Sequence, residues 1–585
     1  MYILGIHYGH DSTAVLLKDG EIVEAMSEER LSRQKKHGGF PHLAIAYIKD
    51  KYKIAEFTDV VVVGEINRGI IFDGVEENAK GRALAIKPKH FLRAIGARFP
   101  LIGKMFAIRD KFLNWRVTRG VSEKVDRYIK EQFPGAEITF INHHLAHAWA
   151  SVPFLPNWKQ SHLVLTLDGA GDDLSGSVNI YKEGNMEQFS TMRDHESLGL
   201  LYCAVVDLLG MQRNEHEFKV MGLAPYAKPS SGKKVYEKLK TMIWFDKEAL
   251  SFRTSFPMDK ATSYLLANEF YNFRFDSLAY GIQYLTEELI KILAKTSLER
   301  YQLNNLALGG GVFMNVKANQ YLREMPEVKS LVVTPSCGDE SLAVGAVVAR
   351  FSELNNGDLS KLIPLSSLYL GSSHTDTDIK QAIDAYQFTM PVEVTYYDPE
   401  GPVTIEHKVA ELLAQNSVVG RFKGRAEWGA RALGNRSILA NPKSRDNVKL
   451  INEMIKGRDF WMPFATSMLY ERRNDYLVDA ENYLAPFMAI TFNTKPKAHT
   501  ELIAALHPYD LTSRPQMVQK ETNPEYHALI SHFEQLTGIG GILNTSFNLH
   551  GEPNVEKPED ALRTFALSGL PYLAIGNYLV GKRGK

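Results

Sequence analysis

The sequence predicts an α/β protein, because one strand pattern occurs twice and a separate α/β pattern follows it. Three short apolar runs at residues 2–6, 13–17 and 21–25 are divided by turn sequences, which predicts a strand meander. The same order of strands and turns returns from residue 162, about 160 residues later. Another alternation of strands and helices starts near residue 377. We therefore expect two similar units followed by a distinct C-terminal unit.

The first turn of each meander is acidic and contains glycine, at Tyr8–Ser12 in the first unit and Asp168–Asp172 in the second. A phosphate group or its metal ion can bind at such a turn. This is the layout of the actin/hexokinase-type ATPase fold, in which two similar lobes close on a nucleotide. The expected parts are lobe 1–160, lobe 161–360, a polar linker at 361–376 and a C-terminal domain at 377–585.

A pair of histidines near the end of the first unit predicts a metal site. His143 and His147 are four residues apart, so on a helix they share one face. Asp168 ends the strand predicted at 163–167, and two imidazoles with a carboxylate suit a transition metal. Taken alone, the pair also fits surface or core histidines that bind nothing.

Two later strand-to-helix turns carry further candidate ligands. Residues 306–315 are an apolar strand, three glycines and a helix start. Glycines such as Gly310 and Gly311 let backbone amides approach a phosphate at the helix N-terminus. Asp339 lies at the next such turn, where it either caps the following helix or supplies another oxygen ligand to the metal.

The composition of the 585-residue chain, with 44% hydrophobic and 23% charged residues, is ordinary for a soluble globular protein. Lys+Arg and Asp+Glu both total 68, so the net charge gives no electrostatic footprint for nucleic acid. The two cysteines, Cys203 and Cys337, indicate a reducing, cytoplasmic setting. No apolar run is long enough for a membrane span, and the N-terminus lacks a basic leader.

The charge distribution is uneven. Residues 80–119 hold eleven Lys/Arg and a single acid, Asp110, with apolar and aromatic residues between them. Two interpretations stay open: an amphipathic helical region with a solvated basic face, or a docking surface for an anionic substrate or membrane surface.

A second basic centre lies in the C-terminal unit. Residues 420–437 contain five Lys/Arg and four glycines in eighteen positions, and Lys456 and Arg514 add to the charge. Arginines bind phosphate oxygens in pairs, and glycines allow close backbone approach. Nucleic-acid binding or a solvated basic surface would not explain Glu427, Trp428 and the glycines within the run. A pocket for a nucleotide and a phosphorylated small molecule explains them better.

Many of these motifs occur in the order found in one known family. The matching pieces are His10-Asp11-Ser12, Glu28-Glu29-Arg30, Arg33-Gln34-Lys35, residues 143–147, 219–223 and 309–315, Cys337-Gly338-Asp339, residues 427–437, Arg514-Pro515-Gln516 and Asn544-Thr545-Ser546. Over essentially its whole length the chain resembles the O-carbamoyltransferases of the nodulation-protein and tobramycin-carbamoyltransferase type. The resemblance implies N-terminal lobes similar to the tRNA threonylcarbamoyl-transferring (Kae1-like) enzymes and a C-terminal domain similar to YrdC.

In such enzymes the C-terminal site makes carbamoyl-adenylate and pyrophosphate from ATP and carbamoyl phosphate. The N-terminal site then transfers the carbamoyl group to a hydroxyl of a small molecule or glycoside. The resemblance implies iron, as Fe²⁺, at the metal site, and we expect Mg²⁺ with the ATP. We expect no nucleic-acid partner, and the basic segment suggests an anionic acceptor. The oligomeric state stays open, with a homodimer as one alternative.

The resemblance also implies roles for individual residues. At the N-terminal site the implied catalytic residues are His10, which takes the acceptor proton, Asp11, which orients the acceptor, and Lys35, which holds phosphate or adenylate charge. The implied metal ligands are His143, His147, Asp168 and Asp339, and the implied nucleotide contacts are Gly310, Gly311 and Asn315. At the C-terminal site, carbamoyl phosphate and ATP would be held by Arg431, Lys456, Met488, Arg514, Asn544 and Ser546.

Two positions depart from the family pattern. Met462 stands where a phosphate-contacting arginine is expected, with Arg458 as a possible substitute, and Phe218 stands where the family tends to have glycine. Two other functions remain open: a fused tRNA threonylcarbamoylation enzyme, and an actin-like, ATP-switched binding protein. The second of these would need only one nucleotide site, and the basic C-terminal centre argues against it.

Overall fold

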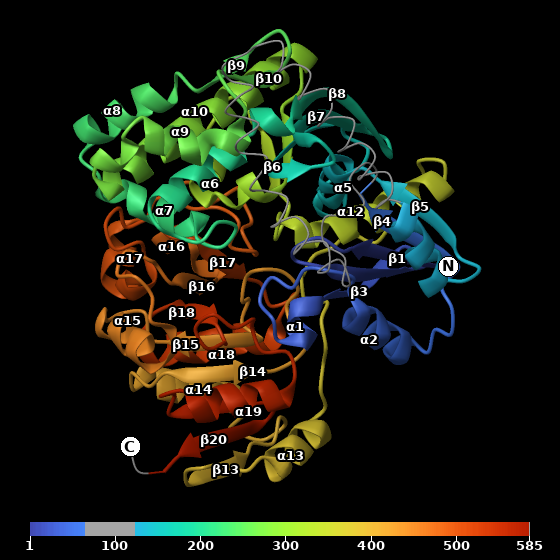
Figure 1. Cartoon of the computed structure of the whole chain (residues 1–585). Coiled ribbons are helices and arrows are strands. Elements are labelled where there is room, and N and C mark those ends of the chain that lie inside the picture. The colour runs from blue at the N-terminus through green and yellow to red at the C-terminus, as the bar shows by residue number, and fades with distance from the viewer. Residues whose placement is uncertain (65–122, 584–585) are drawn as a thin grey trace, which may run out of the picture.

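The computed structural model describes residues 1–64 and 123–583, and the basic segment 80–119 lies outside them. Two N-terminal lobes built on mixed sheets lie beside a C-terminal α/β domain (Figure 1). The predicted α/β class and both predicted meanders are confirmed.

The first sheet joins the predicted meander to two parallel strands. β1 pairs antiparallel with β2 and parallel with β4, and β4 pairs parallel with β5. Apolar residues on both faces are buried, so helices cover both sides of the sheet: α2 (His42–Tyr52) on one side and α12 (Leu342–Leu354) on the other. In sheet order the strands are β3 (Glu21–Ser27), β2 (Thr13–Lys18), β1 (Tyr2–His7), β4 (Asp59–Val63) and β5 (Glu137–Ile141).

The second sheet repeats this arrangement of strands. Its meander pairs antiparallel, and the meander's first strand pairs parallel with β11, which pairs parallel with β12. In sheet order the strands are β8 (Asn185–Arg193), β7 (Leu174–Lys182), β6 (His162–Gly171), β11 (Asn305–Gly309) and β12 (Ser330–Val333). The shared topology accounts for the repeated pattern in the sequence.

Helices α5 (His143–Ala150) and α12 pack against each other between the two sheets. Their approach depends on Gly345, where an added Cβ would lie 1.8 Å from the carbonyl oxygen of Ala146. Because α5 lies between the sheets, the histidines on it face residues from both lobes. The outer face of the second sheet is covered by α6 (Leu198–Leu208) and the long helix α10 (Phe275–Tyr301). The other helices of this lobe are α7 (Glu217–Leu223), α8 (Pro229–Leu239), α9 (Ala261–Ala267) and α11 (Val316–Arg323).

The C-terminal domain is built on one mixed sheet, with α14 (Ile405–Ala414) and α18 (Pro524–Thr537) against one another and α19 (Pro558–Leu567) beside α13 (Asp376–Ala385). In sheet order its strands are β13 (Val392–Tyr396), β20 (Tyr578–Lys582), β19 (Tyr572–Ile575), β14 (Val419–Phe422), β15 (Arg436–Ala440), β18 (Gly541–Ser546), β16 (Ala465–Leu469) and β17 (Pro515–Val518). Shorter helices are α15 (Asp446–Ile451), a π-helical turn at Asn452–Lys456, α16 (Arg473–Tyr476) and α17 (Pro496–Glu501).

An extended segment at 361–374 connects the two parts of the chain (Figure 1). Its backbone bonds to both of them: the Ile363 amide donates to the Gly20 carbonyl, and the Gly371 amide donates to the Ala426 carbonyl. Leu368 and Leu370 are buried. The segment is therefore fixed along the boundary between the parts. Across the described ranges, we find no helix that is both long and apolar enough to cross a membrane.

Candidate functional site

The two histidines and two aspartates predicted as metal ligands lie together. One ligand atom from each of the four residues lies within 4.8 Å of all the others. His143 Nε2 is 3.2 Å from Asp168 Oδ2, and His147 Nε2 is 3.6 Å from Asp339 Oδ1. The set combines α5, the end of β6 and the turn after β12. Two imidazoles and two carboxylates can hold a divalent transition metal.

Local sequence explains why α5 presents its histidines here. Asn142 caps the helix, because its side chain accepts from the amides of His144 and Leu145. The His143 amide donates to Asp172 Oδ2 at 2.8 Å, which ties the helix start to the turn after β6. Gly171 gives room for the ring, because an added Cβ would lie 2.2 Å from His143 Cγ.

The electrostatics of the cluster fit a cation. Burial raises the pKa of Asp168, but the hydrogen bond from His143 and the nearby charge of His147 outweigh it and leave the pKa well below its usual value. Nε2 of His147 is fully buried, and within the described residues it has no hydrogen-bond partner. A buried, unsatisfied imidazole nitrogen between two carboxylates is well suited to bind a metal ion. On the other side of the ring, Ser341 Oγ lies 3.5 Å from Nδ1.

The predicted catalytic residues His10 and Asp11 lie at the edge of this cluster. His10 Nε2 is 3.3 Å from Asp339 Oδ2, and His10 Nδ1 is 3.1 Å from Asp11 Oδ2. The nearby charge of Asp339, more than any other interaction, raises the pKa of His10 to about 10. His7, which we did not predict, lies beside them with Nε2 3.6 Å from Asp339 Oδ2.

Of two adjacent lysines, Lys36 reaches this group of residues and the predicted Lys35 does not. Lys36 Nζ lies 2.8 Å from Asp11 Oδ2, and both residues have left-handed backbone angles, with φ of 54° and 61°. Lys35 Nζ lies 3.7 Å from Glu215, and its side chain is 38% exposed. The sequence shows only two neighbouring lysines, and no periodic pattern distinguishes them.

The glycine turn after β11 lies against the metal cluster. Gly310 has φ 94°, and an added Cβ there would lie 2.3 Å from the Leu167 carbonyl oxygen. The Gly311 amide donates to Asp168 Oδ1 at 3.2 Å. The Asn315 side chain is engaged within the protein: its Oδ1 accepts from the Ala318 amide, and its Nδ2 donates to Gln283. The Asn315 side chain is therefore already engaged by the protein.

In the C-terminal domain, Arg431, Arg458 and Arg514 form a cationic cluster. Burial lowers the pKa of Arg514 well below its usual value, and the charges of Arg431 and Arg458 lower it further. Burial, with help from Arg431, lowers the pKa of Arg458 to about 10. Throughout the part of the chain that the structure describes, no hydrogen bond or ion pair engages the guanidinium of Arg431 or Arg514. Like charges held together without an anionic partner indicate an anion-binding site.

Lys456 and the end of β18 border this cluster. Burial lowers the pKa of Lys456 well below its usual value, with smaller effects from Arg458 and Lys35. Its Nζ lies 3.2 Å from Ser546 Oγ, and Arg458 donates to Thr545 Oγ1 at 2.9 Å. Lys456 and Ser546, both predicted for this site, are thus in contact.

Other predicted residues contribute structure. Asn544 Nδ2 donates to the Ala432 carbonyl at 3.1 Å, next to Arg431 in the chain. Met488 is buried in an apolar cluster with Trp428 and Leu433, and its φ is 57°. These contacts support the segment that carries Arg431.

Met462 and Phe218, the two departures from the family pattern, differ in burial. Met462 is buried. Arg458, on the same loop, packs its guanidinium carbon 4.9 Å from the Phe464 ring centre. Phe218 is exposed on α7, with its ring centre 6.5 Å from that of His216.

The two centres are adjacent across the boundary between the domains. The Ala430 amide donates to Ser336 Oγ at 2.8 Å, three residues before Asp339. An added Cβ at Gly429, whose φ is 97°, would lie 2.5 Å from the same oxygen. The segment that carries Arg431 therefore packs directly on the turn that carries Asp339.

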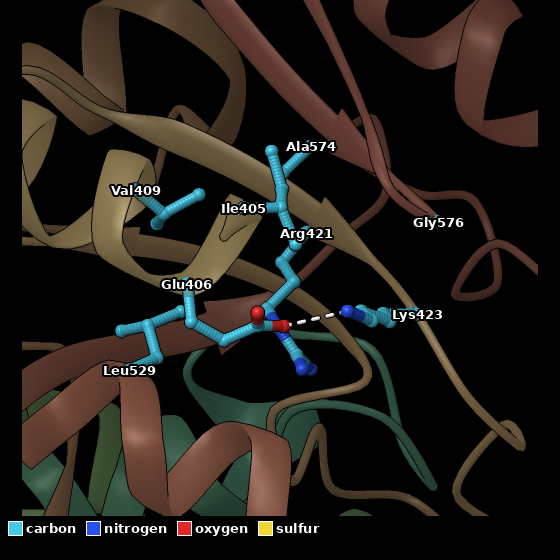
Figure 2. A pocket seen from close by; sticks show the side chains of 8 residues that line it. All are labelled: Ile405, Glu406, Val409, Arg421, Lys423, Leu529, Ala574 and Gly576. Carbon is cyan, nitrogen blue, oxygen red and sulfur yellow. Dashed lines mark hydrogen bonds and ion pairs between the residues drawn. The ribbon is translucent and has the colours of Figure 1, made fainter. Parts of the chain in front are cut away.

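A small cavity elsewhere in the C-terminal domain is lined by Glu406, Arg421 and Lys423 (Figure 2). Lys423 Nζ lies 2.6 Å from Glu406 Oε1. Arg421 Nη1 donates to the Gly434 carbonyl at 2.9 Å, and no predicted site residue lines the cavity.

Comparison with known families defines the class of the protein. The model described as carbamoyltransferase N-terminus matches residues 2–348, and the model described as carbamoyltransferase C-terminus matches residues 410–582. The chain belongs to the carbamoyltransferase family, and it is a carbamoyltransferase enzyme.

Relatives match almost the whole chain. The uncharacterized protein sll1178 of Synechocystis is 30% identical over 99% of this chain and 97% of its own length. Nodulation protein NolNO of Sinorhizobium fredii is 29% identical over 98% of this chain and 79% of its own length. Nodulation protein NolO of Bradyrhizobium diazoefficiens is 32% identical over 76% of this chain and 79% of its own length.

Similar solved structures cover about three fifths of the chain. HypF of T. kodakarensis is 13% identical over 62% of this chain and 49% of its own, with a TM-score of 0.31. A ROK hexokinase of Thermus thermophilus is 15% identical over 60% of this chain and 100% of its own, with a TM-score of 0.29. These scores are too low to support an argument about function.

Proposed function

We propose that this carbamoyltransferase is an ATP-dependent O-carbamoyltransferase with one half-reaction in each part of the chain. In this proposal the N-terminal lobes are of the actin/hexokinase, Kae1-like type, and the C-terminal domain is YrdC-like. The identical strand order of the two N-terminal sheets supports the first assignment. The separate cationic cluster of the C-terminal domain supports a second site for phosphorylated substrates.

The observation that carries the proposal is the set of unpaired, mutually repelling cations Arg431, Arg458 and Arg514, with Lys456 beside them. In the C-terminal half-reaction, water hydrolyses carbamoyl phosphate to carbamate and inorganic phosphate. An oxygen of the carbamate then attacks the α-phosphorus of ATP. Pyrophosphate leaves, and carbamoyl-adenylate remains. Buried cations stabilise the charge that develops in this step, because little water competes with them.

In the N-terminal half-reaction, an acceptor hydroxyl attacks the carbamoyl carbon and AMP leaves. A cation bound to Asp339 would offset the charge that raises the pKa of His10, so that the neutral imidazole could take the hydroxyl proton. Asp11 fixes the orientation of the ring through Nδ1. Lys36 holds Asp11 in place. In this proposal, backbone amides of the glycine turn at residues 310–314 contact the phosphate of the adenylate.

A divalent ion held by His143, His147, Asp168 and Asp339 would supply positive charge next to the adenylate phosphate or the carbamoyl oxygen. We propose Fe²⁺ as this ion and Mg²⁺ as the partner of ATP. The acceptor in this proposal is a hydroxylated small molecule or glycoside. Its anionic character rests on residues 80–119, which lie outside the described ranges.

Pyrophosphate release tests the proposal. The chain should release pyrophosphate from ATP only when carbamoyl phosphate is present. Arg514→Ala should lower that rate by about 100-fold or more, because a charge that stabilises the transition state is lost. Arg445→Ala, which removes an exposed arginine, is the matched control.

Thermal unfolding tests whether Arg514→Ala is correctly folded. Without ligand, Arg514→Ala should be at least as stable as the unmodified chain, because it relieves repulsion among buried cations. Pyrophosphate release that does not depend on carbamoyl phosphate, or that survives in Arg514→Ala, would contradict the proposal.

A further inference from the structure

Arg431 lies on an irregular segment of the C-terminal domain. Residues 423–435, which join β14 to β15, form neither a helix nor a strand. In a regular element the backbone hydrogen bonds fix the direction of each side chain, whereas here groups from other parts of the fold must bond to the backbone. The position of the Arg431 guanidinium therefore depends on the residues that bond to the chain on either side of it.

After Arg431, the segment is held by its own domain. The Ala432 carbonyl accepts from Asn544 Nδ2 at 3.1 Å, and the Leu433 carbonyl accepts from Gln516 Nε2 at 2.8 Å. Asn544 lies on β18 and Gln516 on β17, so both donors belong to the central sheet of the C-terminal domain.

Before Arg431, the segment is held by the N-terminal lobes. Arg30 Nη2 donates to the Gly429 carbonyl at 3.1 Å, and Ser336 Oγ accepts from the Ala430 amide at 2.8 Å. Arg30 is buried, so little water competes for this hydrogen bond. The two residues that precede Arg431 are thus bonded to side chains of another domain.

The Glu28-Glu29-Arg30 motif explains how Arg30 is fixed. Its residues form the start of the short helix α1 (Glu28–Ser32), which lies at the boundary with the C-terminal domain (Figure 1). The Glu28 carboxylate accepts from two backbone amides in the first turn of α2, at 2.8 and 2.9 Å. Glu29 Oε2 accepts from the Lys36 amide at 2.8 Å. The same helix therefore contacts the segment of Arg431 and a residue of the N-terminal centre.

We propose that Arg30 and Ser336 are positioning residues for the C-terminal half-reaction. They hold Arg431 in the cationic cluster from the N-terminal lobes, through the backbone of the two residues before it. The C-terminal site is then complete only when the N-terminal lobes are packed against it. This inference rests on the proposed function, because it takes Arg431 as part of the site for phosphorylated substrates.

The test is a cycle of single and double substitutions in the full chain, with pyrophosphate as the probe and calorimetry as the measurement. Arg30→Met should weaken pyrophosphate binding by about 10-fold, because a residue that orients a binding group typically contributes that much. In a chain that carries Arg431→Ala, the same substitution should cause no further loss, because Arg30 acts through Arg431. Arg30→Lys can still donate to the carbonyl and should restore part of the affinity.

Ser336→Ala removes the second contact and should follow the same pattern, so the test does not depend on one variant. Thermal unfolding of each variant shows that it is folded. The rate of pyrophosphate release from ATP and carbamoyl phosphate should fall in parallel with pyrophosphate affinity.

Arg33→Met is the matched control. Arg33 follows the same helix and also bonds to the C-terminal domain, at the carbonyls of Asn554 (2.6 Å) and Pro553 (2.9 Å). Its substitution removes contacts between the domains without touching residues 429–431, so the affinity for pyrophosphate should stay unchanged. Equal losses in Arg33→Met and Arg30→Met would mean that the boundary is merely loosened, and the inference would be wrong.

Two further results would overturn the inference: a loss in Arg30→Met that is as large with Arg431→Ala as without it, or no pyrophosphate binding by the unsubstituted chain. Pyrophosphate release by the unsubstituted chain tests the proposed function separately. The expected binding pattern without release that depends on carbamoyl phosphate would contradict the proposed function alone, so the two failures can be told apart.

Discussion

The two centres of this protein have opposite electrostatic designs. The N-terminal centre combines imidazoles and carboxylates that partly satisfy one another, and among the described residues the buried His147 Nε2 has no hydrogen-bond partner. The C-terminal centre gathers buried cations, and in the described residues no hydrogen bond or ion pair engages the guanidinium of Arg431 or Arg514. In the proposed function, a cation would complete the first centre and an anion the second.

The comparison indicates which of the two centres costs the protein more stability when no ligand is bound. Burying charges of opposite sign together costs less than burying charges of one sign, because their attraction offsets part of the desolvation penalty. Buried charges of one sign are compensated only when a ligand of opposite charge binds. Without one, burial and the neighbouring cations lower the pKa values of Arg458 and Lys456. The C-terminal centre is therefore the one whose stability should respond more strongly to anionic substrates.

Removing one carboxylate of the N-terminal centre should have the largest effect. Asp339→Asn should lower the affinity for a divalent metal by more than about 100-fold, because it removes a charged ligand. Metal content per chain after dialysis against a chelator measures this. Asp194→Asn changes an exposed aspartate that also lies beside a histidine, His195, and should leave the metal content unchanged. Full metal content in Asp339→Asn would refute the assigned ligand set.

Substitution of Lys36, one of the two neighbouring lysines, should have the next largest effect, on the rate of carbamoyl transfer. Lys36→Met should lower kcat for carbamoyl transfer by about 10-fold, because Asp11 loses its ion pair and His10 loses a fixed orientation. Lys36→Arg should restore part of the rate. The measurement uses an acceptor that is identified by a mass gain of one carbamoyl group.

Lys35→Met is the comparison for that pair, since Lys35 contacts Glu215 instead. The structure predicts that it changes kcat less than Lys36→Met does. The reverse order would show that Lys35, as the sequence predicted, is the lysine that acts.

The pH dependence of stability probes the cationic centre. The folded pKa of Lys456 lies below its unfolded value, so the unfolded chain binds more protons between the two. Its contribution should make the free energy of unfolding rise with pH in that window, by up to about 1.4 kcal/mol per pH unit. Chemical denaturation at pH 7 and 9 measures the slope.

Lys456→Met should reduce this slope, and Lys449→Met, which removes an exposed lysine paired with Glu453, should not. ATP should bind more weakly at pH 9 than at pH 7, because the uncharged lysine attracts phosphate less. Equal slopes in the unmodified chain and Lys456→Met would show that Lys456 is not perturbed.

The smallest effect is expected from a change at the boundary between the N-terminal lobes and the C-terminal domain, where the two centres meet. Arg425 donates to the carbonyls of Val23 and Leu370 and pairs with the buried Glu24 at 3.1 Å. Arg425→Met should lower the free energy of unfolding by about 1–2 kcal/mol. Arg583→Met, which breaks an exposed pair with Glu393, is the control and should change little. Denaturant unfolding of both variants decides the point.

Sequence reasoning named candidate ligands that have a local signature: His143 and His147 follow helical spacing, and Asp168 ends a strand. Asp339 stayed open between a helix cap and a ligand, and the family resemblance completed the set of four that lies together in the structure. Residues without such a signature were missed. His7 lies within a strand, and Lys36 lies beside an equivalent lysine.

The sequence by itself determined the α/β class, the repeated strand meander, the candidate metal ligands and a basic C-terminal centre. These depend on periodicity, turn residues and charge, which are local properties of the chain. Only the tertiary structure decided that Lys36 reaches Asp11, that Asn315 is engaged by Gln283 and that Ala430 packs on Ser336. Those contacts join residues far apart in the chain or choose between neighbours, and they are set by how helices and sheets pack together.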